Sequence, residues 1–293
     1  MPTFYMTIGV SGCGKTTWAM NQPNIQPRLV LDSDAIREEL YGNWADQSHN
    51  TQVFDEMYRR TVEAMKRGID YIYYVATNLS IKRRIQLLDR LRKMFPQYIY
   101  RCRVFVRTPN TLYRQNYQRE HCVPMYVIDR QLRQFQLPVE NEGWDNIFYD
   151  IERVSDDYYN NIRRRIEEFG SQDNPHHTLT LSEHLDACQD LVLSIAHDAS
   201  ANLLDLLEAA SLHDVGKIFT RSYDEKGIAH YFGHENIGAQ IALLFHDQPY
   251  SAQLINYHMV PYDYKGREIW KKRLGEDMWK DLLLLHQADE GAH

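Results

Sequence analysis

The sequence predicts two domains, an α/β domain with a parallel sheet wrapped by helices, followed by an all-α domain. The chain has 293 residues, which exceeds one ordinary domain and allows two separate cores. Up to about residue 150, short apolar runs alternate with helical patterns, as in a parallel sheet joined by helices. From Leu179 onward the strand signals vanish and apolar residues recur at helical spacing.

Five apolar runs of the first half predict buried strands. They are Phe4–Ile8, Leu29–Leu31, Tyr71–Val75, Val104–Val106 and Ile147–Tyr149. A helix is expected over residues 155–170, ended by Gly170, and the polar stretch that follows contains Pro175, which bars its continuation. We therefore predict domains at 1–153 and 176–293, with a connecting helix and linker at 154–175.

Composition and charge narrow the class of protein. No apolar run is long enough to span a bilayer, and the first residues do not form a signal peptide. The four cysteines (Cys13, Cys102, Cys122 and Cys188) form no CxxC pair, so we expect reduced thiols, a cytoplasmic location and no membrane association.

The net charge is −7, but residues 76–135 carry thirteen Lys and Arg against three acids. This asymmetry favours a local polyanion site, with a solvated basic helix face as the alternative.

The first predicted strand leads into a complete G-x-x-x-x-G-K-[ST] motif at residues 9–16. A strand, a glycine-rich loop and a helix are the context that this motif needs. In such a loop, backbone N–H groups surround the phosphates, Lys15 reaches the β and γ oxygens, and Thr16 is placed to bind Mg²⁺. The predicted ligands of ATP or another NTP are Gly9, Ser11, Gly12, Cys13, Gly14, Lys15, Thr16 and Thr17.

A pair of charged residues follows the second predicted strand. Asp34 and Arg37 are three positions apart, so they share one face of a helix. The carboxylate could accept a proton from an attacking hydroxyl while the guanidinium holds a neighbouring phosphate. The alternative is an acid at a helix start in an exposed ion pair.

Together these residues resemble the phage-type 5′-OH polynucleotide kinase family over roughly residues 3–150. The resemblance rests on the P-loop, the D-x-x-R of Asp34 and Arg37, residues 77–79 after the third strand, and the segment 116–119. It implies phosphoryl transfer from ATP to a polynucleotide 5′-hydroxyl. In that case Asp34 is the general base, Arg37 binds the substrate phosphate and Arg119 clamps the donor phosphates, with Arg114 a weaker candidate.

One position departs from the family pattern. An aspartate is usual just before the Thr-Asn pair, where this chain has Val75 and Ala76. The difference indicates either another fine specificity or a related kinase that acts on a small molecule. The basic segment favours a polyanionic acceptor. Asn78 could bond a sugar or phosphate, or serve a strand-end turn.

The second half places ligand-type side chains on apolar helix faces. An unpaired buried carboxylate or imidazole costs several kcal/mol, so one shared partner is the economical explanation, and a divalent metal is that partner. The residues concerned are His184, His213, Asp214, His234, His258 and Asp289.

The order of these residues resembles the HD phosphohydrolase superfamily over about residues 176–293. Residues 211–217 match its core motif, and the flanking segments 230–235 and 287–289 strengthen the match. The pairs at 197–198 and 246–247 also read His-Asp but lack the Gly-Lys that follows in the motif. We treat these two pairs as decoys.

The resemblance implies a metal-dependent hydrolysis. His184, His213, Asp214 and Asp289 would hold a first metal, and His234 and His258 would complete a second metal bridged by Asp214, with water as nucleophile. Lys217 would stabilise the phosphate. The expected ions are one or two of Mn²⁺, Fe²⁺, Co²⁺ and Ni²⁺, beside Mg²⁺ at the kinase site. His177 and His230 are further phosphate contacts or surface histidines.

A 5′-OH kinase beside a phosphohydrolase suggests healing of RNA or DNA ends for a downstream ligase. One domain would add a 5′-phosphate, and the other would remove a 3′-phosphate or a 2′,3′-cyclic phosphate. Cyclic phosphates need a 2′-hydroxyl, which favours RNA. The alternatives are a nucleoside or sugar kinase fused to a nucleotide phosphohydrolase, and an HD domain that only senses nucleotides.

Overall fold

The computed structural model describes residues 1–23, 26–175, 178–196 and 202–292. The chain divides into two compact units. The first comprises residues 1–131 and 138–151, and the second residues 132–137 and 152–293. The predicted fold class is confirmed, with a parallel-sheet α/β unit followed by a helical unit.

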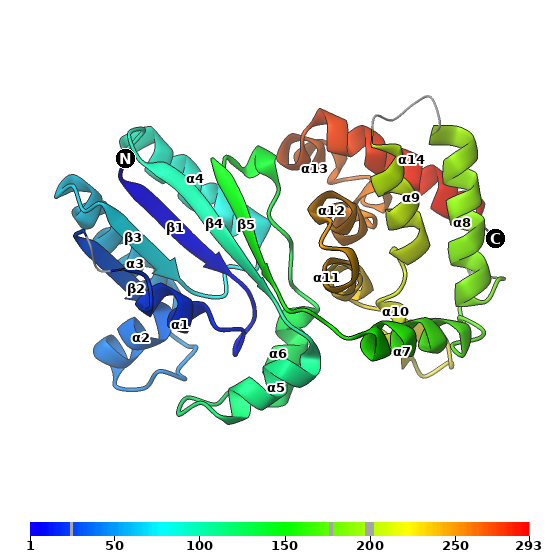
Figure 1. The fold of residues 1–293 in the computed structure, drawn as a ribbon, viewed down its shortest axis with the longest axis horizontal. Coiled ribbons are helices and arrows are strands. Elements are labelled where there is room, and N and C mark those ends of the chain that lie inside the picture. Colours follow the sequence, from blue (N-terminus) through cyan, green and yellow to red (C-terminus); the bar gives the residue numbers. More distant parts are fainter. Residues whose placement is uncertain (24–25, 176–177, 197–201, 293) are drawn as a thin grey trace. The chain divides into compact units, whose positions relative to one another are not determined.

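A five-stranded parallel sheet forms the centre of the first unit, in the order β2-β3-β1-β4-β5. Each predicted strand lies within an observed one, and all five run in the same direction (Figure 1). Parallel strands bring their carboxyl ends to one edge of the sheet, where the P-loop begins. The strands are β1 (Thr3–Ile8), β2 (Arg28–Asp32), β3 (Tyr71–Val75), β4 (Ile99–Val106) and β5 (Asn146–Ile151).

Different side chains pack on the two faces of this sheet. Phe4 on one face is fully buried and packs against Tyr74 and Tyr100. On the other face, the short helix α1 packs Trp18 against Tyr5 and its neighbours. The helices of this unit are α1 (Lys15–Met20), α2 (Ser33–Tyr41), α3 (Asn50–Lys66), α4 (Ile81–Met94), α5 (Pro109–Tyr117) and α6 (Met125–Leu132), with the 3₁₀ turn η1 (Glu140–Glu142).

Acidic residues from outside the basic segment neutralise part of its charge. The guanidinium of Arg84 makes two bonds to the carboxylate of Glu142, at 2.8 and 2.7 Å, and both side chains are buried. Three further pairs are more exposed, and exposed pairs contribute little to stability. They are Arg92–Asp145, Arg103–Asp150 and Arg107–Asp150. Four of the thirteen cations thus have acidic partners within the unit.

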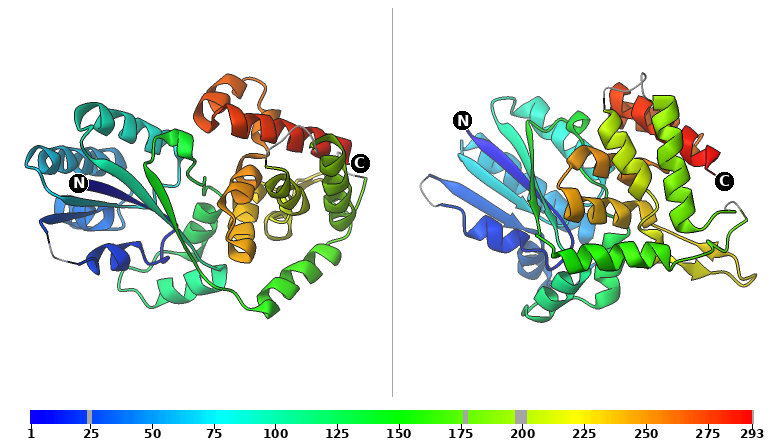
Figure 2. Two further views of the ribbon diagram at one scale, coloured as in Figure 1. Left: turned by 45° about the horizontal axis from the view of Figure 1, so that its top comes forward. Right: turned by 45° about the vertical axis from the view of Figure 1, so that its right-hand side comes forward.

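Helices form most of the regular structure of the second unit. The expectation of a wholly helical second half was wrong in one detail, because β6 (Ser222–Tyr223) and β7 (Ala229–His230) pair as an antiparallel hairpin, seen as two short yellow arrows in Figure 2. A two-residue strand is too short for a periodic signal. The helices are α7 (Asp156–Glu167), α8 (Leu181–Ala196), α9 (Leu203–Leu212), α10 (Lys217–Thr220), α11 (His234–His246), α12 (Pro249–Tyr257), α13 (Arg267–Leu274) and α14 (Glu276–Gly291), with the turn η2 (Val260–Tyr262).

Residues 132–137 belong to the second unit although both flanks belong to the first. Buried polar side chains of α11 and α12 satisfy the backbone of this segment. Asn256 donates to the carbonyl of Phe135 and accepts from the N–H of Leu137, and Gln240 donates to the carbonyl of Leu132. Backbone polar groups that leave water need such partners.

Within the described residues, no helix is both long enough and apolar enough to cross a membrane. All four cysteines are free, and Cys122 is the exposed one.

Candidate active sites

The P-loop joins the carboxyl end of β1 to the start of α1. Gly12 has a φ of 85°, a backbone conformation that side-chain-bearing residues rarely adopt. A Cβ there would also lie 3.1 Å from the carbonyl oxygen of Leu112 in α5. The loop is therefore packed closely against α5, the helix that carries Arg114 and precedes Arg119.

Lys15 and Thr16 both have bonding partners at the loop. The Nζ atom of Lys15 donates to the carbonyl of Val10 at 2.7 Å and lies 3.6 Å from the Sγ of Cys13. The hydroxyl of Thr16 donates to Oδ2 of Asp32 at 2.7 Å. Both side chains thus lie at the loop, and their phosphate and Mg²⁺ contacts stay predictions.

Asp32 connects the P-loop to the predicted general base. Its Oδ1 accepts from the backbone N–H of Asp34 at 2.9 Å and caps α2, while its Oδ2 accepts from Thr16. The sequence analysis did not select Asp32. Its position as the last residue of a parallel strand was the signal in the sequence that could have identified it, because ligands bind at the carboxyl ends of such strands.

The Asp34–Arg37 pair is present, with 2.7 Å between the carboxylate Oδ1 and the guanidinium. The guanidinium is buried and also donates to the carbonyl of Trp44 and to Asn50. The Asp34 side chain is 41% exposed. The pair is thus not the simple exposed ion pair of the alternative interpretation, since Arg37 holds the carboxylate from the protein side.

The two candidates for clamping the donor phosphates, Arg114 and Arg119, lie near the end of α5. Arg114 is exposed on the helix and Arg119 follows its C-terminus, half-buried. Asn116 holds the segment after α5 in place. Its side-chain amide donates to the carbonyl of Val123 and accepts from the backbone N–H of the same residue. On the P-loop side, the N–H of Ser11 donates to Oε1 of Gln131 at 2.7 Å, a contact that no sequence pattern predicted.

The two residues before the Thr-Asn pair differ in exposure from the pair itself, which is half-buried. Val75 and Ala76 are both buried. Asn78 has a φ of 49° and donates its amide to the carbonyl of Thr7 in β1. These features favour the turn interpretation of Asn78 over contact with a substrate.

In the second unit, six ligand-type side chains come together from three helices and from the turns that follow two others. His184 lies on α8, and His213 and Asp214 follow α9. His234 begins α11, His258 follows α12, and Asp289 lies on α14. Two groups result, one of His184, His213 and Asp289, and the other of Asp214, His234 and His258; within each group the ligand atoms all lie within 4.8 Å of one another.

Each of the four imidazoles is oriented by a backbone carbonyl on its Nδ1 side. The Nδ1 atoms of His184, His213, His234 and His258 lie 2.7 to 2.9 Å from the carbonyls of Ala292, Ala210, Tyr231 and Ile255. A neutral imidazole that donates from Nδ1 presents a lone pair at Nε2. Carbonyls in this position are the usual support of metal-binding histidines.

The Nε2 atoms face one another in pairs. Those of His184 and His213 are 3.2 Å apart, as are those of His234 and His258. Two lone pairs at this distance repel unless a cation lies between them. The donor set therefore fits divalent metals, with nitrogen and carboxylate ligands suited to transition ions.

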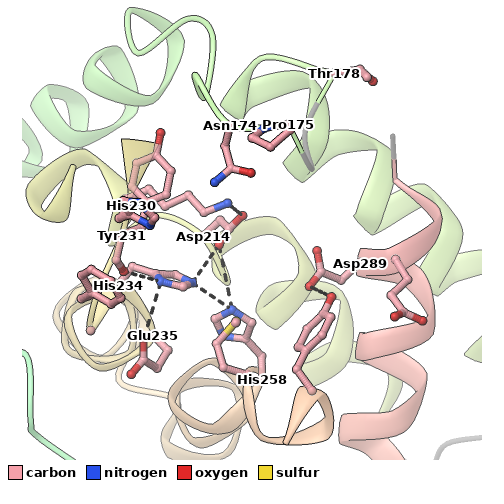
Figure 3. Close-up of a pocket in the computed structure, with 16 residues that line it drawn as sticks. Asn174, Pro175, Thr178, Asp214, His230, Tyr231, His234, Glu235, His258 and Asp289 are labelled. Carbon is pink, nitrogen blue, oxygen red and sulfur yellow. Dashed lines mark hydrogen bonds and ion pairs between the residues drawn. The ribbon is translucent and has the colours of Figure 1, made fainter. Parts of the chain in front are cut away.

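Asp214 lies between the two groups. Its Oδ2 is 3.4 Å from Nε2 of His184 and 3.5 Å from Nε2 of His213. Its Oδ1 is 3.1 Å from Nε2 of His234 and 3.9 Å from that of His258. Figure 3 shows this carboxylate pointing towards His234 and His258. One carboxylate oxygen per group is the arrangement that a bridging ligand requires.

Gly216 explains why a glycine follows the His-Asp pair. A Cβ at this position would lie 2.0 Å from the backbone carbonyl oxygen of His234. The missing side chain lets α11 approach the loop that carries Asp214. Lys217, the next residue, is buried and its Nζ lies 2.5 Å from Oδ2 of Asp214 and 2.8 Å from Oε1 of Gln172.

The charges of the site follow from burial and from neighbouring groups. Burial lowers the pKa of His213, but the carboxylates of Asp214 and Asp289 outweigh it and raise that pKa to about 9. Burial and the neighbouring imidazoles lower the pKa of His258 to about 3. Burial raises the pKa of Asp214, but Lys217 and His213 hold it well below the usual range. With this pKa, the metal-free His213 is protonated at neutral pH, so a metal that binds there displaces its proton, whereas His258 is already neutral.

A cavity of about 940 Å³ opens over these residues. Asp214, Lys217, His234, His258 and Asp289 lie in its wall. Tyr262, which the sequence analysis did not select, also lines it and donates its hydroxyl to Oδ2 of Asp289 at 2.9 Å.

The remaining histidines of the sequence analysis lie elsewhere or in the cavity wall. His230, one of the two further phosphate candidates, lines the cavity. His246, one decoy, lies at a separate hollow of the second unit and in neither ligand group. His177 and the decoy pair His197-Asp198 fall outside the described residues.

A phosphate-binding loop at a parallel sheet and a histidine-carboxylate site in a helical unit define a nucleotide-binding domain joined to a metallohydrolase-type domain. Comparison with known families agrees with both assignments. Residues 4–138 match the AAA domain family, and residues 181–290 match the HD domain family. The chain is thus a P-loop kinase-like domain fused to an HD domain.

One solved structure that is similar to this chain is described as a fungal RNA kinase. The two share 14% sequence identity with a TM-score of 0.38. The match covers 71% of this chain and 49% of the other. This chain therefore spans about half the length of the chain that it matches.

Proposed function

We propose that the chain is a bifunctional enzyme that heals nucleic-acid ends. The P-loop domain transfers the γ-phosphate of ATP, or of another NTP, to a polynucleotide 5′-hydroxyl. The HD domain removes a 3′-phosphate or a 2′,3′-cyclic phosphate with divalent metals. The observation that carries the proposal is the bonded series from Thr16 through Asp32 to Asp34, which joins a nucleotide loop to a carboxylate.

The geometry near Asp34 supports its role as general base. Its side chain is exposed while Arg37 holds it from within the protein. An incoming hydroxyl can therefore reach the carboxylate, and the fixed position favours proton transfer. The P-loop of residues 9–17 would bind the NTP, with Thr16 holding Mg²⁺ and Arg119 clamping the donor phosphates.

An aromatic pair supports a nucleoside as the acceptor. Trp44, whose carbonyl accepts from Arg37, stacks on His121 with 4.6 Å between ring centroids and 8° between planes. Trp44 follows α2 and His121 follows α5. Flat aromatic groups beside a kinase acceptor site suit a nucleobase.

The ligand groups of the HD domain support a phosphohydrolase rather than a sensor. Metals held by His184, His213, Asp289, Asp214, His234 and His258 would activate water and neutralise phosphoryl oxygens. Lys217 is already oriented towards the same cavity, and its charge would stabilise the phosphate. Asp214 would bridge the two metals, because one of its carboxylate oxygens faces each group of ligands.

The pairing of the two activities supports polynucleotide ends as the substrate. A 5′-phosphate and a free 3′-hydroxyl are the ends that a ligase joins, so a nucleic-acid ligase acts downstream in this proposal. RNA is favoured over DNA, because a cyclic phosphate requires a 2′-hydroxyl.

The alternative is a nucleoside or sugar kinase fused to a nucleotide phosphohydrolase or sensor. Two observations favour it. Val75 and Ala76 stand where the polynucleotide kinases have an acid, and part of the basic segment is already paired. The acceptor assay below separates the two functions.

The test uses an oligonucleotide with a 5′-hydroxyl and a 2′,3′-cyclic phosphate. It is incubated with ATP and, in turn, Mg²⁺, Mn²⁺, Fe²⁺, Co²⁺ and Ni²⁺, and both termini are analysed. We expect a new 5′-phosphate and loss of the cyclic phosphate. Asp34→Asn should block the first change alone and Asp214→Ala the second alone. Phosphorylation of free nucleosides or sugars in place of the oligonucleotide would support the alternative.

A further inference from the structure

A stacked aromatic pair, of the half-buried His230 and the exposed Phe232, lines the HD cavity. The rings of His230 and Phe232 are stacked, with 5.4 Å between centroids and 5° between planes. Phe232 is 71% exposed, although Phe is a residue type that folding usually buries. Both residues lie in the wall of the same cavity as Asp214 and Lys217.

The backbone holds this pair in place. His230 ends the β6–β7 hairpin, and its Nε2 lies 3.3 Å from Oδ2 of Asp224. The carbonyl of Phe232 accepts from the guanidinium of Arg133 at 3.1 Å. Tyr231, the residue between them in the sequence, points inward, with its hydroxyl bonded to the carbonyl of Gln172. The stacked rings are therefore a fixed surface rather than a loose loop.

The cavity is larger than a phosphate site requires. Its volume of about 940 Å³ lies near the upper end of the range, roughly 300–1,000 Å³, in which whole small molecules bind. The charged groups of the lining are the Asp214–Lys217 pair and the acids Glu235, Asp289 and Glu290, while Phe232 and Met259 supply apolar wall. A ligand that fills this space carries a phosphate at one part and a flat apolar group at another.

We propose that the exposed face of Phe232 stacks the nucleobase of the nucleotide whose phosphate is hydrolysed at Asp214. The proposal rests on the proposed phosphohydrolase function and names what its cavity recognises beyond the phosphate. His230 supports the other face of the Phe232 ring, so the base adds a third layer to an existing stack. Stacking on an aromatic ring tolerates all bases, because each base has a π face.

Hydrolysis of two oligonucleotides by the full chain tests this proposal. One ends in an ordinary nucleotide with a 3′-phosphate, and the other ends in an abasic ribose with a 3′-phosphate. We expect the first to have a higher kcat/KM by roughly 5- to 100-fold, the range expected for one stacked base. Phe232→Ala should remove the difference, mainly through KM, and Phe232→Trp should restore it.

A matched control is Tyr264→Ala. Tyr264 is an aromatic residue of the same domain and is 67% exposed, but it lies outside the lining of the cavity. Its replacement should leave the preference unchanged. Equal kcat/KM for both substrates in the unaltered protein, or an equal loss on both in Phe232→Ala, would overturn the proposal.

A binding measurement separates this proposal from the proposed function. If neither oligonucleotide is hydrolysed, the phosphohydrolase function fails. Calorimetry of the Mn²⁺-loaded protein with adenosine 3′-monophosphate and with ribose 5-phosphate then decides the role of Phe232. Tighter binding of the nucleotide that disappears in Phe232→Ala supports stacking, and equal affinities refute it.

Discussion

The Nζ atom of Lys217 lies 2.5 Å from Oδ2 of Asp214, three residues earlier. The same carboxylate lies between two groups of potential metal ligands. Lys217 therefore acts on the site through its positive charge. Its ammonium group cannot bind a metal, because it has no lone pair to donate. The role of this lysine can be separated from that of the ligands.

We expect Lys217→Ala to lower phosphohydrolase kcat by about 100- to 1,000-fold, the loss typical of removing one preorganised donor. Metal content should stay unchanged, because every ligand remains. Elemental analysis and steady-state kinetics measure the two quantities on the same preparation. Loss of the metal from this variant would assign Lys217 to support of the site rather than to the substrate.

Asp214→Ala should remove metal binding and phosphohydrolase activity together. Kinase activity should survive, because the P-loop domain has its own core. His246→Ala serves as the control, since His246 also precedes an aspartate but lies in neither ligand group. A folded Asp214→Ala protein with normal metal content and normal hydrolysis would refute the assignment.

Gly216→Ala should destabilise the HD domain. The added methyl would lie 2.0 Å from the backbone carbonyl oxygen of His234, and overpacking of this kind costs about 1–3 kcal/mol or more. The midpoint temperature of thermal unfolding and the affinity for metal should both fall. In Gly291→Ala, the new Cβ meets only the side-chain end of Leu191, at 3.1 Å, so this control should have a much smaller effect.

Lys15→Ala should abolish kinase turnover and leave hydrolysis at the HD site intact. The change removes the cation that the P-loop directs at the transferring phosphoryl group. Transfer from labelled ATP and release of the 3′-phosphate are assayed in parallel. Retained kinase activity would exclude the P-loop as the site of transfer.

Asp34→Asn should lower the kinase rate by about 100-fold or more while ATP binding stays nearly unchanged. The amide keeps the shape of the side chain but cannot accept the proton. Weak ATP binding with a normal single-turnover rate would contradict the assignment.

The buried Arg37 allows a separate prediction. Its guanidinium bonds to Asp34, Trp44 and Asn50, which supports a role in holding Asp34 in place of the phosphate binding that the resemblance implies. Arg37→Lys should therefore lower kcat for phosphorylated and unphosphorylated acceptors alike. A rise in KM confined to acceptors with a phosphate next to the reacting nucleoside would instead assign Arg37 to phosphate binding.

Much of the architecture could be predicted from the sequence. The alternation of apolar runs and helices indicated the parallel sheet, and each predicted strand lies within an observed one. The hairpin at Ser222–Tyr223 and Ala229–His230 was missed, because two-residue strands carry no periodicity. The basic segment was interpreted as a polyanion site, with a solvated helix face as the alternative, yet its Arg84 is buried against Glu142, 58 residues away. Pairing over such a distance leaves no local signal.

The sequence by itself determined which residue types are present and where each lies along a helix or strand. That information suffices for the P-loop of residues 9–16 and for the order of the His and Asp residues, because both depend on local spacing. The tertiary structure decided which of them meet. It placed one oxygen of Asp214 towards each ligand group, set Asp32 between Thr16 and Asp34, and brought residues 132–137 into the second unit. These relationships depend on how helices and strands distant in sequence pack together, and packing is a property of the whole fold.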